Sequence, residues 1–99
     1  MKAVKRVEIV VEVAEINNFL AVLKQVGVEA YTLIRHVGGQ GERGERRPEE
    51  FMYEVENAYF IVACEAAQAE ALVAALRPLL VKSGGMCLVS DATWVVHKG

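Results

Sequence analysis

The sequence predicts an α+β fold whose elements follow the order β-α-β-β-α-β, and three observations favour this prediction. Residues 4–13 alternate between apolar and polar side chains, which is typical of a half-buried strand. Residues 16–26 and 66–81 have the apolar spacing or the alanine- and leucine-rich composition of helices. Three further runs, at 28–37, 51–64 and 86–96, contain many of the β-branched and aromatic residues that strands prefer.

The first strand, Val4 to Val13, separates its side chains between two faces. Its apolar face consists of Val7, Ile9, Val11 and Val13, and its polar face of Arg6, Glu8 and Glu12. The following helix has an apolar stripe formed by Ile16, Phe19, Leu20, Leu23 and Val26. We expect Gly27 just past its C-terminus, because glycine readily adopts the left-handed conformation that ends many helices.

The second strand is predicted over Val28 to Val37. The third is predicted over Phe51 to Cys64, with Tyr59 to Cys64 as its buried part. A second helix follows from Ala66 to Val81. Pro78 is expected to bend this helix or to end its regular part, because proline lacks an N–H donor and clashes one turn back.

The last strand is predicted over Met86 to Val96, after a tight turn at Ser83-Gly84-Gly85. Two right-handed crossovers then give a ferredoxin-like sandwich, in which a four-stranded antiparallel sheet carries both helices on one face. The other face still presents Val10, Tyr59 and Ile61. An exposed apolar sheet normally packs against something, so we expect a symmetric oligomer with sheet facing sheet.

The overall composition describes one small domain over residues 1–99 with balanced charge. The chain is 54% hydrophobic, and its 11 basic and 13 acidic residues create no basic field for nucleic acid. No run approaches the roughly 20 apolar residues of a bilayer span, and we expect a cytoplasmic location. Cys64 and Cys87 lie within apolar runs and are predicted to be buried thiols, with no metal site.

The most unusual segment is Val37 to Glu50, which holds four glycines, three arginines and four glutamates between two predicted strands. A plain hairpin needs only two to five residues there. Glycines that bring backbone N–H groups close to a ligand, followed by arginine, are typical of an anion-binding turn. A solvated loop is the alternative interpretation.

The turn at Ser83-Gly84-Gly85 is a second glycine-rich connection, and a simple helix cap is its alternative interpretation. The predicted topology allows the exit of the second strand and the start of the last strand to lie at the same end of neighbouring strands or subunits. Two glycine turns could then converge on one anion. Neither turn has the spacing of a Rossmann or Walker motif.

The residues Val28-Glu29-Ala30-Tyr31-Thr32-Leu33-Ile34, followed by Gly38-Gly39-Gln40-Gly41-Glu42-Arg43-Gly44, resemble the second strand and T-loop start of PII signalling proteins. The resemblance is closest to the PII-like branch linked to bicarbonate transport and carboxysomes. Ser83-Gly84-Gly85-Met86 falls where that family has its B-loop. The element order fits over nearly the whole chain.

This resemblance implies a homotrimer with an adenine-nucleotide site in each cleft between subunits. Thr32 would contact adenine, and Gly39, Gln40, Gly41 and Arg43 would cradle phosphates. The implied nucleotide-binding residues are Thr32, Gly38, Gly39, Gln40, Gly41, Arg43, Ser83, Gly84 and Gly85. The segment Gly38 to Met52 would be a T-loop that docks on a membrane transporter or enzyme, with Glu45, Arg46, Arg47, Glu49 and Glu50 facing the partner.

Departures from the family pattern bear on the ligand. Ser83-Gly84-Gly85-Met86 lacks the B-loop lysine of the nitrogen-regulating type, and the chain lacks that type's late arginines. With fewer cations, AMP, ADP or cyclic AMP is a better candidate than Mg-ATP with 2-oxoglutarate, and bicarbonate is a further candidate. The resemblance implies a regulatory protein rather than an enzyme, with no tightly bound cofactor.

Two alternatives remain at this point. A trimeric metal-tolerance protein of the CutA type would have to use Cys64, Cys87, His36 or His97, and both histidines are more typical of surface or strand-edge positions. A small acylphosphatase-like enzyme would share the fold, but the Gly-x-Val-Gln-Gly-Val-x-x-Arg loop of that family is absent.

Overall fold

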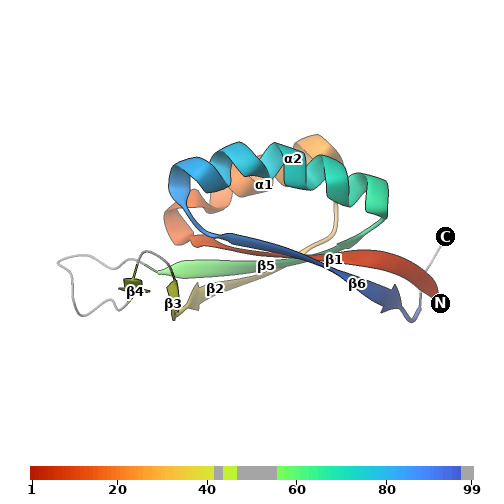
Figure 1. The fold of residues 1–99 in the computed structure, drawn as a ribbon, viewed down its shortest axis with the longest axis horizontal. Helices are drawn as coiled ribbons and strands as arrows, with labels where there is room; N and C mark the ends of the chain where they lie inside the picture. Colours follow the sequence, from red (N-terminus) through yellow and green to blue (C-terminus); the bar gives the residue numbers. More distant parts are fainter. Residues whose placement is uncertain (42–43, 47–55, 97–99) are drawn as a thin grey trace.

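The computed structural model describes residues 1–41, 44–46 and 56–96 of the chain (Figure 1). The elements are β1 (Lys2–Glu12), a 3₁₀ turn (Val13–Glu15), α1 (Ile16–Val26), β2 (Thr32–Val37), β3 (Gly39–Gly41), β4 (Gly44–Arg46), β5 (Asn57–Cys64), α2 (Ala66–Ser83) and β6 (Met86–Trp94).

Four strands form one sheet in the order β2-β5-β1-β6, and every neighbouring pair is antiparallel. Both helices lie on the same side of this sheet, as Figure 1 shows. The short strands β3 and β4 pair with each other as a separate ribbon beyond one end of the sheet. The predicted ferredoxin-like βαββαβ fold is therefore confirmed.

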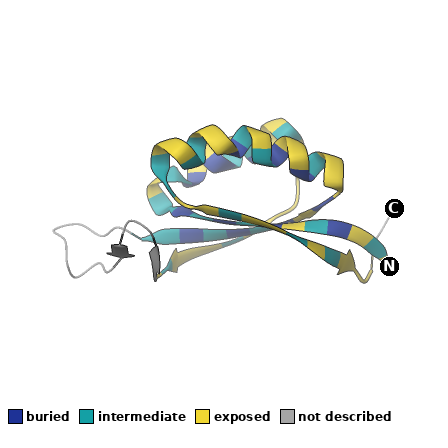
Figure 2. Ribbon diagram, in the orientation of Figure 1, coloured by how far each residue is buried: buried dark blue, intermediate teal, exposed yellow. Residues whose placement is uncertain are grey.

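The core lies between the helices and the sheet (Figure 2). The predicted apolar face of the first strand is confirmed for Val7, Ile9 and Val11, while Val13 is only half-buried in the 3₁₀ turn. The largest fully buried side chains are Phe19, Phe60, Ile9, Leu23, Leu72 and Leu76.

Helix α1 has the bounds that its apolar spacing predicts. Gly27 adopts a left-handed φ of 89°, and its N–H donates to the carbonyls of Leu23 and Lys24. The N–H of Val28 returns 2.8 Å to the Leu23 carbonyl, and the Val28 side chain is buried. This pattern closes the helix C-terminus and packs an apolar side chain beneath it.

This helix cap explains why β2 begins at Thr32 rather than at Val28. The Val28 N–H is hydrogen-bonded to the end of α1. The chain then crosses to the edge of the sheet, where pairing with β5 begins at Thr32. The predicted third strand begins at Asn57 among the described residues, and residues 51–55 lie outside them.

Of the two outcomes expected at Pro78, a bend or an end of the regular helix, the second is wrong, because α2 continues to Ser83. Proline removes the bond that its own N–H would donate to the carbonyl of Ala74. Both Pro78 and Ala74 are exposed, so water can satisfy the freed carbonyl. The last strand ends at Trp94, two residues earlier than predicted.

In the described part of the chain, both helices lie on one face of the sheet, and the second face presents apolar side chains. Strand register places Leu88, Glu8, Ile61 and Thr32 in one row across this face, and Met86, Val10, Tyr59 and Ile34 in the next. We call the apolar members of these rows the outer patch: Met86, Leu88, Val10, Tyr59, Ile61 and Ile34. Within it, Leu88 is 51% exposed and Ile34 is 49% exposed.

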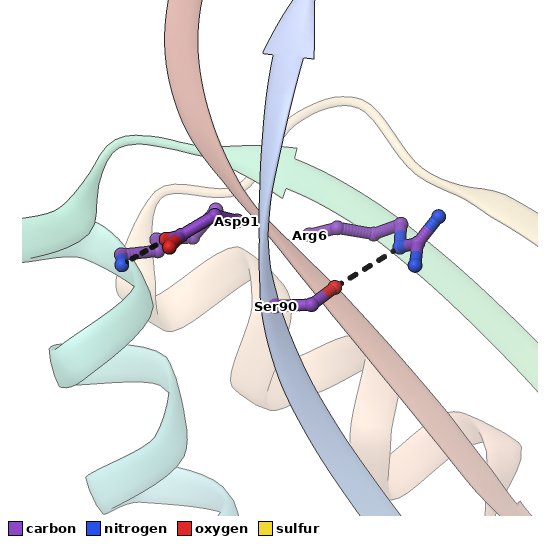
Figure 3. Close-up of polar contacts among 4 residues, drawn as sticks. Arg6, Ser90 and Asp91 are labelled. Atoms are coloured by element: carbon purple, nitrogen blue, oxygen red, sulfur yellow. Dashed lines mark hydrogen bonds and ion pairs between the residues drawn. The ribbon is translucent and has the colours of Figure 1, made fainter.

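Four polar side chains of this face form two hydrogen-bonded pairs. The Tyr59 hydroxyl donates to Glu8 Oε1 at 2.6 Å, and this bond, with burial, raises the pKa of Tyr59. Arg6 Nε donates to Ser90 Oγ at 3.2 Å. Figure 3 shows Arg6 and Ser90 on one side of the β1–β6 pair, and Asp91, which accepts from Lys5, on the other.

Candidate functional site

The two glycine-rich connections lie at the same end of the sheet but on its opposite edges (Figure 1). Met86, just after the second glycine turn, pairs with Val10 near the end of β1. Val37, just before the first glycine segment, pairs with Asn57, which also pairs with Glu12. Strands β5 and β1 lie between the two edges, and three strand spacings amount to about 14 Å.

The turn before β6 depends on glycine for two reasons. Gly84 and Gly85 have φ values of 78° and 106°, which side chains rarely tolerate. A Cβ on Gly85 would also lie 2.5 Å from the Val10 carbonyl oxygen. The Gly84 N–H donates to the Leu80 carbonyl at 2.8 Å, so this donor caps α2. The tight turn predicted here is therefore present, and so is the helix cap that was its alternative interpretation. The Gly84 N–H is the donor that forms this cap.

A polar contact connects this turn to the start of α1. Ser83 Oγ donates to Glu15 Oε1 at 2.9 Å, and Asn18 Nδ2 donates to the same oxygen at 3.2 Å. The Ser83 hydrogen bond, followed by that of Asn18 and the charge of Lys82, holds the pKa of Glu15 below its usual range. Glu15 therefore fixes the position of the glycine turn in its ionised form.

Replacing Glu15 with glutamine should cause a small loss of stability near neutral pH that disappears in acid. The pKa of Glu15 is lower in the folded chain than in the unfolded chain, so its contribution is present above the unfolded value and is lost as pH falls through the folded one. Denaturant unfolding of both proteins between neutral pH and about pH 3 measures this. A stability difference that stays constant over that range would contradict it.

Thr32 opens edge strand β2 and lies on the outer face, opposite Ile61. Its side chain is exposed. Gly38 follows the strand, and a Cβ placed there would meet no atom within 4 Å. Gly39, Gln40 and Gly41 form β3, which pairs with Arg46, Glu45 and Gly44 of β4.

The structure thus places the backbone of most predicted nucleotide-binding residues but not of all of them. Arg43 lies outside the described residues. Of the residues predicted to face a partner, Glu45 and Arg46 lie in β4, whereas Arg47, Glu49 and Glu50 lie outside the described residues. Within one chain, Thr32 and the Ser83–Gly85 turn stand on opposite sheet edges.

Cys64, Cys87 and His36, the candidate metal ligands that the structure describes, do not converge. Cys64 and Cys87 are free thiols on different strands, opposite Lys5 and Ile9 of β1 respectively, and burial raises the pKa of both. Cys64 is buried as predicted, but Cys87 is only half-buried. His36 is an exposed residue of an edge strand, as expected, and His97 lies outside the described residues. Among the described residues, no group of three or more His, Cys, Asp or Glu side chains could hold a metal ion.

Two contacts at this end of the sheet are not predicted from the sequence. One is the Glu15–Ser83 hydrogen bond, which spans 68 positions. The other joins His36 Nδ1 to Glu56 Oε2 beside the first glycine segment. Neither pair has a sequence spacing that signals contact, so only the assembled sheet and helices reveal them.

Comparisons with known proteins agree with this architecture. The model of the family described as nitrogen regulatory protein P-II matches residues 4–98. The fold is similar to that of CPII, a nitrogen regulatory PII-like protein from Thiomonas intermedia K12 bound to ADP, AMP and bicarbonate, with a TM-score of 0.83 and 22% identity over 93% of this chain and 88% of that one. A comparison with curated proteins gives no match.

Two further solved structures have the same fold. A PII-like signaling protein from Thermus thermophilus gives a TM-score of 0.76 and 21% identity, covering 95% of this chain and 91% of that one. The GlnK–ATP complex of B. subtilis gives a TM-score of 0.64 and 17% identity, covering 93% and 84%.

Proposed function

Because the chain belongs to the nitrogen regulatory protein P-II family, whose model matches residues 4–98, we propose that it is a trimeric, non-enzymatic regulatory protein that binds an adenine nucleotide between subunits. Members of this family act in signalling. The proposed effectors are AMP, ADP or cyclic AMP, with bicarbonate as a further ligand. The proposed target is a transporter or an enzyme.

The observation that carries the proposal is the position of the two glycine turns at one end of the sheet, on opposite edges. In a closed ring of copies, the β6 edge of one subunit can lie beside the β2 edge of the next. The Ser83–Gly85 turn of one copy would then approach Thr32 of its neighbour. A single chain holds these groups apart, so the site requires the assembly.

The outer patch supports assembly with the sheets facing inward. It is too apolar to be left in water by a small domain, and its polar neighbours Glu8, Tyr59, Arg6 and Ser90 already have hydrogen-bond partners. Covering this face therefore removes apolar area from water without stranding those polar groups.

The low positive charge of the second glycine turn favours a ligand with few phosphates. Residues 82–86 supply one lysine, Lys82, which also acts on Glu15. Each phosphate added to the ligand would bring negative charge that this turn cannot match. ADP, AMP and bicarbonate are the ligands seen with CPII, and we extend that set to this chain.

The segment after β2 is proposed to act as the T-loop that contacts the target, with Glu45, Arg46, Arg47, Glu49 and Glu50 facing the partner. Neither α1 nor α2, the helices of the described part, has the length and apolar character to cross a bilayer. We propose a cytoplasmic protein that reaches any membrane target by docking. Pull-down of the target with and without ADP tests this step.

A sizing measurement combined with calorimetry tests the function. A trimer that binds AMP, ADP or cyclic AMP more tightly than ATP is the expected result. A monomer that binds none of AMP, ADP, ATP and cyclic AMP would remove the proposal. Repeating the ADP titration with bicarbonate in the buffer tests the second ligand. Bicarbonate should tighten ADP binding if the two ligands bind side by side at the same time.

Replacing Arg43 with alanine should weaken ADP binding by about 10- to 100-fold, because a hydrogen bond to a charged group contributes roughly 1.5–3 kcal/mol. Calorimetry measures the change. Arg77→Ala is the matched control, since it removes the same charge from an exposed position on α2. Equal affinities for the two variants would show that Arg43 does not contact the ligand.

A further inference from the structure

Strand β2 contains an irregularity two residues before the first glycine segment. Ile34 pairs with Tyr59 and Val37 pairs with Asn57, so β2 uses three residue steps where β5 uses two. The additional residue makes a β-bulge, a feature that bends a strand and changes its direction. Residues 35–36 therefore determine the direction in which the backbone leaves the sheet edge.

His36 occupies this bulge in an unusual conformation. Its φ is 62°, and it is the one residue other than glycine with a positive φ among residues 1–41, 44–46 and 56–96. A non-glycine residue in this region is held there by its surroundings at a cost in free energy. Histidine tolerates the left-handed region better than β-branched residues do.

The contact that can hold His36 there is with Glu56. His36 Nδ1 meets Glu56 Oε2, and the carboxylate side chain is the less exposed of the two, at 21% against 64%. Because a carboxylate only accepts, Nδ1 must carry the proton. Glu56 directly precedes β5, and its carbonyl accepts from the Val13 N–H at 2.8 Å, which anchors it to the end of β1. The contact thus connects a strained residue to a fixed one.

We propose that His36 and Glu56 are positioning residues for the nucleotide-binding segment Gly38–Gly41, and this proposal rests on the proposed function. Their contact holds the bulge, and the bulge sets the direction in which Gly38–Gly41 leaves β2. Among the residues whose side chains the structure describes, the other charged or titratable groups on the paired strands are Arg35 on β2 and Glu12 on β1, with Glu8 and Tyr59 further along the sheet.

The first test compares the ADP affinity of three proteins at one pH. His36→Asn keeps a residue that tolerates a positive φ but is too short to keep the contact with Glu56. Glu56→Gln replaces the charged acceptor with a weaker, neutral one. We expect either variant to bind ADP about two- to five-fold more weakly than the wild type, as for the weakening of one hydrogen bond.

Two further variants separate positioning from general damage. His36→Val should weaken ADP binding, because a β-branched residue resists the positive φ, whereas His36→Gly should retain more of the affinity because it keeps the backbone conformation. Wild-type affinity in both His36→Asn and Glu56→Gln, or equal losses for valine and glycine, would overturn the proposal.

The second test needs no nucleotide, so its result is independent of the proposed function. In the ligand-free protein, the amide signals of Gly38, Gly39 and Gly41 should move in the same direction in His36→Asn and in Glu56→Gln, because both variants weaken the same contact. Glycine amides that keep their wild-type positions in both variants would refute the positioning role, even if ADP binds. If ADP does not bind but the glycine amides move together in both variants, the proposed function fails and the positioning contact stands.

Discussion

Replacing Gly85 with alanine is expected to destabilise the protein by about 2–4 kcal/mol, as measured by denaturant unfolding. Two costs add at this position. The φ of 106° lies outside the range that alanine adopts readily, and the new Cβ would lie 2.5 Å from the Val10 carbonyl oxygen. That oxygen belongs to the backbone of β1, which pairs on both sides and cannot move aside cheaply.

The melting temperature should fall accordingly, by more than about 8 °C for a domain of this size. Gly38→Ala is the matched control for stability, because a Cβ there meets nothing within 4 Å. Its unfolding free energy should stay within about 0.5 kcal/mol of the wild-type value. If both alanine variants were equally stable, Gly85 could not approach β1 as closely as the structure places it.

The same position links the turn to binding. The requirement for glycine at 84–85 alone indicates only a tight connection, and a helix cap explains the Gly84 N–H. Binding is the additional proposal, and a Gly85→Ala protein that still folds allows it to be examined. Its backbone donors would be displaced, so ADP affinity should fall even where the fold persists.

Elements with strong local signals were predictable from the sequence. The apolar stripe and Gly27 define α1 to the residue, because both the buried face and the stop signal lie within the helix itself. The first strand was predictable from alternation for the same reason, although it begins two residues earlier and ends one residue earlier than predicted. Errors arose at positions where the local sequence pattern fits more than one outcome. Val28 joins the helix cap instead of β2, and Pro78 stays within α2 because its lost hydrogen bond faces solvent.

The candidate site was predictable only as a set of segments. Glycine composition and family resemblance identified Gly38–Gly41 and Ser83–Gly85. Their position on opposite edges follows from the strand order β2-β5-β1-β6, which no local pattern encodes. The His36 bulge depends on a register shift against β5, and the Glu15–Ser83 bond depends on the packing of α1 beside α2. Such long-range pairs require the assembled fold.

Because the two glycine turns lie on opposite sheet edges, the proposed site forms only between subunits. The outer patch is the proposed interface between those subunits, so a substitution there should affect both assembly and binding. Replacing Leu88 with arginine should convert the proposed trimer into monomers and abolish measurable ADP binding. Leu88 is 51% exposed in the single chain, so arginine there can extend into water and leave the subunit folded. In a sheet-to-sheet interface, the same charge would be buried without a partner, which costs roughly 3–5 kcal/mol.

Light scattering after size exclusion, with ADP calorimetry on the same samples, measures both consequences of the Leu88 substitution. Val81→Arg is the matched control, because Val81 is 77% exposed on α2, on the helical side of the sheet. It should leave the assembly and the ADP affinity unchanged. A Leu88→Arg protein that remains trimeric would show that the outer patch is not the interface. A monomeric variant that still binds ADP would show that one chain holds the complete site. The proposal that the site forms between the sheet edges of two subunits would then be wrong.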